Sequence, residues 1–289
     1  MHLSPSQEDI DYWVSTLLPP KDVYYLDGHY RPAPDPRYEI IPVTDLRDHP
    51  QYGAIEYLNA YEYWAMDNDK TREVLVSEPD YFASLPMPER ARLFGLQVAL
   101  KRGMVFDNDV LRGKAFQKMI QHAGVEGRLV LNHLIWERMN LNIRQQTAQR
   151  VARSWEDDWE VEDLPASLAP HIQQIANTWL HAEGANCFGV ALYAAANAGE
   201  WLHTWVDQAT FLSGIEASGY LLSADTQEQA GDLLLFYDAK DHLRHAAFAV
   251  EQGLVLNKNG QVKFQPVKLL RTQKLLDEWP DHKMAIWRR

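Results

Sequence analysis

The sequence predicts an α+β fold, in which a mostly helical N-terminal region precedes a C-terminal region of helices followed by short strands. Helical signals dominate residues 52–151, and the run 187–197 reads as a helix of small residues. Beyond it, short runs rich in β-branched and aromatic residues are separated by Gly231, Gly253 and Gly260, which is typical of strands. Helices first and an antiparallel meander afterwards is the order of an α+β protein.

The composition is that of a folded protein, because 46% of the residues are hydrophobic and 24% are charged. The 289 residues suffice for one large domain or two ordinary ones. The 28 Lys and Arg against 40 Asp and Glu give a net charge of −12. Such acidity disfavours binding to phosphate backbones, so we expect no nucleic-acid partner. The 10 Trp and 13 Tyr favour a heavily packed core and a groove for an extended ligand.

The N-terminus lacks a basic stretch followed by an apolar one, so the sequence predicts no secretory signal. The longest weakly polar stretch, 187–198, is too short to span a bilayer. We therefore expect a cytoplasmic protein with no membrane partner.

The N-terminal half is interpreted from its helix signals and its prolines. A short helix is expected at 8–18, capped by Ser6, and an irregular proline-rich segment follows to residue 50. Three longer helices are expected at 88–102, 109–122 and 129–151. No role follows from these residues.

An acidic segment separates the two halves. Residues 154–165 hold six acidic side chains and end in Pro165, a pattern typical of a solvated linker or an exposed turn. We therefore expect two domains, 1–165 and 166–289. In the second, the sequence predicts helices at 167–180, 187–197 and 207–217, and strands at 232–238, 245–250, 254–258, 262–267 and 284–287.

Cys187 is the one cysteine of the chain, so it forms no intramolecular disulfide and no multi-cysteine zinc site. Gly184 and Asn186 end the preceding element, which places Cys187 in the first turn of a helix. The free N–H groups and the dipole of a helix N-terminus lower a thiol pKa, and a thiolate is a nucleophile for amide and ester chemistry. The alternative is a small buried hydrophobic residue without a chemical role.

A base for this nucleophile is expected at His245, at the start of a strand. If residues 251–253 form a three-residue loop, Val250 pairs with Leu254 and Phe248 pairs with Leu256. Asn257 then shares a face with His245 and can orient its imidazole while His245 faces the thiol. A two-residue turn would instead point Asn257 into the core beside Phe248, which the hydrophobic pattern disfavours. Asn259 has the same parity and could take the role of Asn257 if the loop were longer.

These elements, in this order and spacing, resemble NlpC-type and CHAP-type papain-like cysteine peptidases and amidases. The matching segments are 186–189, 231–236, 245–250 and Asn257, within residues 178–267, about a third of the chain. The resemblance implies a papain-like domain in which a cysteine-bearing helix packs on an antiparallel sheet that carries the histidine. It implies Cys187 as nucleophile, His245 as base, Asn257 as third polar residue and the backbone N–H of Cys187 as an oxyanion donor. Phe188 departs from the small hydroxyl residue that usually follows the cysteine.

Further candidates are weaker. His181 and Asn186 are considered as oxyanion-hole side chains, since both precede Cys187 closely. His242 and His245 are spaced three apart, but no second cluster completes a metal site, so we expect no metal and no cofactor. Trp201 and Trp205 are expected in helix packing, with a cleft wall as the alternative.

The sequence therefore predicts a cysteine-dependent hydrolase or acyl-transferase with a Cys-His-Asn triad. Its substrate would be a peptide or an amide-containing small molecule, attacked at an amide, isopeptide or thioester carbonyl. Two alternatives remain open: a catalytically silent binding or scaffold protein on the same fold, and a biosynthetic amide-forming enzyme.

Overall fold

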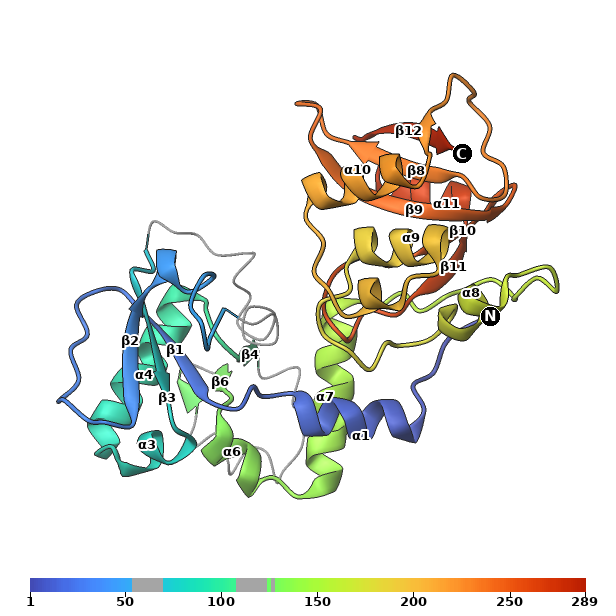
Figure 1. Cartoon of the computed structure of the whole chain (residues 1–289). Coiled ribbons are helices and arrows are strands. Elements are labelled where there is room, and N and C mark those ends of the chain that lie inside the picture. The colour runs from blue at the N-terminus through green and yellow to red at the C-terminus, as the bar shows by residue number, and fades with distance from the viewer. Residues whose placement is uncertain (54–69, 108–123, 126–127) are drawn as a thin grey trace. The chain divides into compact units, whose positions relative to one another are not determined.

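The computed structural model describes residues 1–53, 70–107, 124–125 and 128–289, and the helix expected at 109–122 lies outside them (Figure 1). The described elements are helices and antiparallel strands, which confirms the α+β class. The chain forms two compact units: Ile10–Ser154, and Met1–Asp9 together with Trp155–Arg289. No helix among the described residues combines the length and the apolar character needed to cross a bilayer.

The first unit begins within α1 (Gln7–Thr16) and contains a three-stranded antiparallel sheet in the order β1-β3-β2. The strands are β1 (Asp22–Leu26), β2 (Tyr38–Pro42) and β3 (Glu73–Ser77). The expected irregular segment therefore contains two strands, because short apolar runs lie between its prolines. Gln97 satisfies the backbone of Tyr25 at the outer edge of β1: its side chain accepts from Tyr25 N–H and donates to Tyr25 C=O, each at 2.8 Å.

The remainder of this unit comprises short helices and a second small sheet. The helices are α3 (Pro79–Ser84), α4 (Met87–Leu100), α6 (His133–Arg138) and α7 (Leu141–Trp155), and the strands are β4 (Val105–Asp107), β5 (Gly124–Val125) and β6 (Arg128–Val130). The single helix expected at 129–151 is wrong, because its first residues form β6. Asn132 then starts a new helix by accepting a hydrogen bond from Ile135 N–H at 3.1 Å.

The acidic segment expected as a solvated linker is instead an integral part of the second unit. Trp159 is fully buried, and Glu156 forms an ion pair with the buried Lys268. The backbone N–H of Glu162 donates to Leu269 C=O at 2.9 Å. These contacts explain why the division between the units falls after Ser154, eleven residues before the boundary expected from the sequence.

The second unit is built on a six-stranded antiparallel sheet in the order β11-β10-β9-β8-β12-β7. Its strands are β7 (Leu221–Leu222), β8 (Leu233–Tyr237), β9 (Leu243–Glu251), β10 (Leu254–Asn257), β11 (Lys268–Arg271) and β12 (Lys283–Arg288). Its helices are α8 (Pro170–Ile175), α9 (Cys187–Ala196), α10 (Gln208–Ala217) and α11 (Thr272–Glu278). The strand expected at 262–267 is wrong: this segment is a turn, and the strand begins at Lys268.

Both faces of this sheet are covered. Ala246, Phe248 and Leu256 belong to the hydrophobic cluster that includes most of α9. Ala247 and Val255 belong to the opposite cluster, which includes Leu275 of α11. Figure 1 shows α9 lying alongside β9 and β10. Alternate residues of β9 therefore face different helices.

The β9–β10 hairpin differs from the expected one in its turn and agrees in its register. Leu254 pairs with Glu251 across a two-residue turn, so the three-residue loop and the Val250–Leu254 pair are wrong. A register shift follows, and Leu256 then pairs with Phe248 as expected. Val250 is the extra residue on β9 and forms a bulge, which restores the expected alternation of side chains between the two faces. The two-residue turn therefore does not force Asn257 into the core beside Phe248.

Candidate functional site

Cys187 is the first residue of α9, as the sequence predicts. Asn186 caps the helix: its Oδ1 accepts from Gly189 N–H at 3.0 Å and its Nδ2 donates to Val206 C=O at 2.7 Å. Gly189 permits the close approach of the next segment, since a Cβ there would lie 2.5 Å from Trp201 O. These local contacts fix the end of the helix and with it the position of the partly exposed cysteine.

His245 and Asn257 are brought together by the hairpin. Both are 1% exposed, and His245 Nε2 donates to Asn257 Oδ1 at 2.6 Å. The indole of Trp279, which follows α11, stacks on the imidazole with 4.5 Å between ring centroids and 16° between planes. The ring is therefore held by a hydrogen bond at one edge and by an aromatic side chain on one face, and Nδ1 is the nitrogen left for a reacting partner.

The thiol and the imidazole approach β9 from different sides. Cys187 packs with the α9 cluster, whereas His245 shares the alternation of Ala247 on the α11 side. The backbone N–H of Ala246, the residue after His245, donates towards the thiol. No hydrogen bond joins the side chains of Cys187 and His245. The structure thus shows no contact between these two side chains, and the role of each in a triad stays a prediction.

Burial keeps both groups neutral near pH 7. It raises the pKa of Cys187 to about 11, although the N–H groups of Ala246 and Phe188 oppose the shift. It lowers the pKa of His245 to about 4, against the hydrogen bond to Asn257 and with a further contribution from His282. Both pKa shifts disfavour a thiolate–imidazolium pair in this conformation.

Asn257 is itself held by a polar chain that leads to the surface. Its Nδ2 donates to Asn259 Oδ1 at 2.7 Å, and Asn259 Nδ2 donates to Glu278 Oε2 at 2.9 Å. A longer contact of 3.5 Å joins Asn259 Nδ2 to Glu156 Oε1. Asn259 thus supports Asn257 rather than replacing it beside His245.

Lys258 is a buried cation that sequence reasoning missed. It is 2% exposed, and its Nζ donates to Gly260 C=O at 2.8 Å and Val262 C=O at 3.0 Å. Burial lowers its pKa to about 8, against the charges of Glu156, Glu183 and Cys187. No local signal predicts this position, because β10 ends at Asn257 and strand alternation does not extend to Lys258. The charge of Lys258 nevertheless interacts with the thiol of Cys187.

The remaining candidates have structural partners. His181 Nε2 lies 2.8 Å from Asp9 Oδ1, and Asn186 serves as the helix cap, so the proposed oxyanion role of these two side chains stays a prediction. His242 contacts Asp238 in an exposed turn. Trp205 Nε1 donates to Gln261 Oε1 at 2.8 Å. Among the described residues, no three His, Cys, Asp or Glu side chains are arranged to hold a metal ion.

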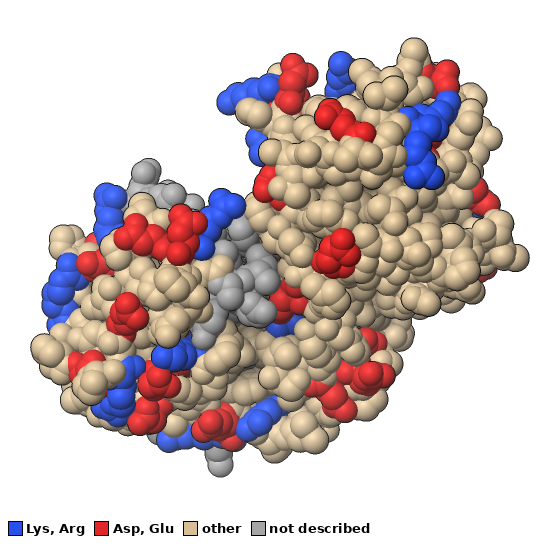
Figure 2. Space-filling model, in the orientation of Figure 1, with Lys and Arg blue, Asp and Glu red and all other residues tan. Residues whose placement is uncertain are grey.

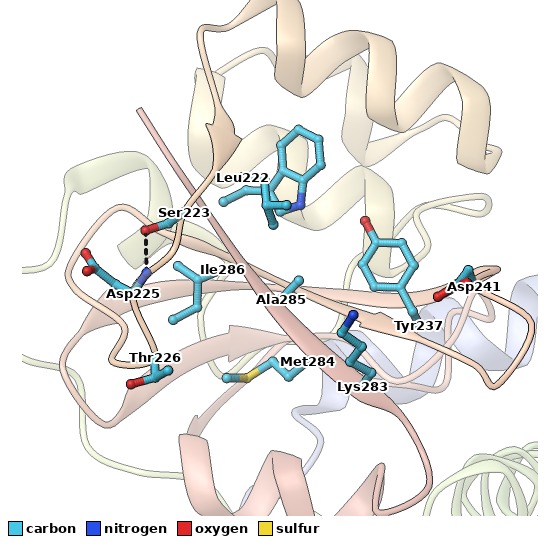
Figure 3. Close-up of a pocket in the computed structure, with 11 residues that line it drawn as sticks. Leu222, Ser223, Asp225, Thr226, Tyr237, Asp241, Lys283, Met284, Ala285 and Ile286 are labelled. Carbon is cyan, nitrogen blue, oxygen red and sulfur yellow. Dashed lines mark hydrogen bonds between the residues drawn. The ribbon is translucent and has the colours of Figure 1, made fainter.

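A pocket of about 550 Å³ lies elsewhere on the second unit, along β12 (Figure 3). Tyr237, Ala285 and Leu222 line it, and Lys283 and Asp225 contribute charges. Cys187, His245 and Asn257 are not among its lining residues, so it is a separate concavity. On the face shown in Figure 2, acidic and basic side chains are interspersed, and no continuous basic stripe is visible there.

Comparisons with protein-family models, with curated proteins and with solved structures found no match to this chain.

Proposed function

We propose that the second unit is a papain-like catalytic domain, a cysteine-dependent hydrolase or acyl-transferase acting on an amide, isopeptide or thioester bond. The observation that carries this proposal is the hydrogen bond of 2.6 Å between His245 Nε2 and Asn257 Oδ1. It leaves Nδ1 as the free ring nitrogen beside the strand residue whose N–H reaches the Cys187 thiol. A nucleophile, a base and a group that orients the base are the parts of a triad.

The proposed reaction begins with attack of Cys187 Sγ on the carbonyl carbon, while the thiol proton passes to His245 Nδ1. This transfer requires the two side chains, which lie on different sides of β9, to come within hydrogen-bond reach during the reaction. The tetrahedral intermediate then collapses as His245 returns that proton to the leaving group, an amine from an amide or isopeptide and a thiol from a thioester, which leaves the acyl group as a thioester on Cys187. Water completes a hydrolysis, and an amine acceptor completes a transfer. Because both groups are neutral at rest, proton transfer accompanies the attack rather than preceding it.

Asn257, the third polar group, orients the imidazole of His245. Asn257 holds the imidazole in the tautomer that carries its proton on Nε2, and it stabilises the imidazolium that forms during attack. The His245–Asn257 hydrogen bond is buried, since both side chains are almost fully excluded from solvent, and removal of water strengthens such a bond. The substrate class is a peptide or an amide-containing small molecule, and the chemistry requires no cofactor.

A catalytically silent protein on the same fold is the second candidate. The observations that favour it are the pKa of about 11 for Cys187 and the absence of a hydrogen bond between its thiol and His245. In such a protein Cys187 is a packing residue, and the His245–Asn257 pair stabilises the hairpin.

Alkylation of Cys187 by iodoacetamide, followed by intact mass between pH 6 and 11, separates the two candidates. In an enzyme, the rate at pH 7 depends on His245, so His245→Gln should lower it by about tenfold or more. In a silent protein, the alkylation rate follows the ionisation of an isolated thiol, so the wild type and His245→Gln should react equally fast. His242→Gln is the matched control, because it removes an exposed imidazole from the turn that leads into β9.

A further inference from the structure

The end of α11 is connected to the imidazole by an unbroken series of hydrogen bonds. Glu278, the last residue of α11, accepts from Asn259 Nδ2; Asn259 Oδ1 accepts from Asn257 Nδ2; and Asn257 Oδ1 accepts from His245 Nε2. Their lengths are 2.9, 2.7 and 2.6 Å. Trp279, the next residue after Glu278, stacks on the same imidazole. One helix end therefore supplies both an aromatic and a carboxylate support.

The series has a fixed direction because a carboxylate can only accept. Glu278 therefore requires the NH₂ group of Asn259 to point towards it, which turns Asn259 Oδ1 towards Asn257. Because Asn259 Oδ1 can only accept, the NH₂ group of Asn257 must point towards it. Asn257 Oδ1 then points towards His245 Nε2. An oxygen there requires a proton on Nε2, and the neutral ring then has its free lone pair on Nδ1. Each amide could otherwise be reversed, since its two ends have almost the same shape.

The surrounding charges reinforce this direction. Glu156 lies 3.5 Å from Asn259 Nδ2 and is a second acceptor for it. Burial raises the pKa of Glu156, and the ion pair with Lys268 opposes that shift, which favours the carboxylate form. Both acidic groups beside Asn259 therefore select the same orientation of its amide.

We infer that Asn259 and Glu278 are positioning residues that fix the orientation of the Asn257 amide and thereby the Nε2–H tautomer of His245. This inference deepens the proposed function, because Nδ1 must be unprotonated to receive the thiol proton. Loss of the Glu278 carboxylate therefore removes the acceptor that sets the direction of the amide series.

The test is the tautomer of His245, measured by ¹⁵N NMR on the full chain labelled at histidine, with the resonance assigned by its loss in His245→Gln. Asn259→Leu removes both polar ends at similar size. We expect the ratio of Nε2–H to Nδ1–H forms to fall by about tenfold, the scale of one net hydrogen bond. The double variant Asn259→Asp with Glu278→Gln exchanges donor and acceptor at the outer bond. It keeps an acceptor for Asn257, so the wild-type tautomer should be retained.

Asp277→Asn is the matched control, because Asp277 is an exposed carboxylate of α11 bonded to Gln273 and not to the series. An unchanged tautomer in Asn259→Leu, or an equal change in the double variant, would overturn the inference. If Asn259→Leu does not fold, Glu278→Ala replaces it; this exposed position should tolerate the change and give a shift of about threefold, and no shift overturns the inference. No substrate is used, so the result stands whether or not alkylation shows Cys187 to be activated.

Discussion

The two faces of the six-stranded sheet support the site in different ways. On the α11 face, His245 and Asn257 are buried, and directional hydrogen bonds fix their orientation. On the α9 face, the thiol of Cys187 lies among apolar side chains, with the N–H of Ala246 and the charge of Lys258 as its polar surroundings. The α11 face therefore controls the orientation of the imidazole, and the α9 face controls the ionisation of the thiol. Changes on the two faces should therefore alter different observables.

The largest effect is expected at the nucleophile. Cys187→Ser should lower turnover on peptide amides and thioesters by at least about 10³-fold, because a serine hydroxyl is far less acidic than a thiol. The fold should persist, since the replacement is small. Turnover in a panel of substrates and the melting temperature are the measurements, and full activity of the variant would exclude the cysteine mechanism.

The next effect concerns stability at low pH, and it isolates the α11 face. The pKa of His245 is lowered from 6.5 to about 4, so between these values the unfolded chain binds the extra proton. Stability is therefore lost as the pH falls from 6.5 towards 4, by about 3 kcal/mol. Urea unfolding across this range should show that loss in the wild type, and His245→Gln should reduce its slope. Equal slopes would mean that His245 is not buried as a neutral group.

A smaller effect is expected at Asn257. Asn257→Ala removes the acceptor for Nε2–H but leaves the base, so kcat should fall by about 10- to 100-fold, much less than in His245→Ala. KM should change little, because Asn257 does not contact the substrate in the proposed reaction. A larger loss in Asn257→Ala than in His245→Ala would contradict the assigned roles.

The smallest effect belongs to the α9 face. The ammonium of Lys258 favours the thiolate of Cys187, so Lys258→Met should raise the pKa read from the alkylation rate by about one unit or less. The tautomer of His245 should not change. Lys274→Met, which breaks a partly exposed ion pair with Asp158, is the control and should leave the profile as in the wild type. A tautomer change in Lys258→Met would mean that the two faces are not independent.

The sequence predicted those parts of the site that depend on local signals. Asn186 and the small residues after Cys187 define a helix start, and the structure places that start where the sequence does. The pairing of Phe248 with Leu256 followed from the alternation of apolar residues, although the turn differed. The bulge could not be foreseen, since it compensates a two-residue turn by a local distortion of β9.

Local signals in the sequence specify α9 with Cys187 at its first turn, and a hairpin that sets His245 and Asn257 on one face. Contacts between distant parts of the chain place Trp279 on the imidazole of His245 and Glu278 beside Asn259. They also bury Lys258, whose charge interacts with the thiol. These two sets of features differ in how far apart in the sequence the interacting residues lie. Helix caps and strand alternation act between neighbours in the chain, whereas burial, which shifts the pKa values of Cys187 and His245, depends on elements that only folding brings together.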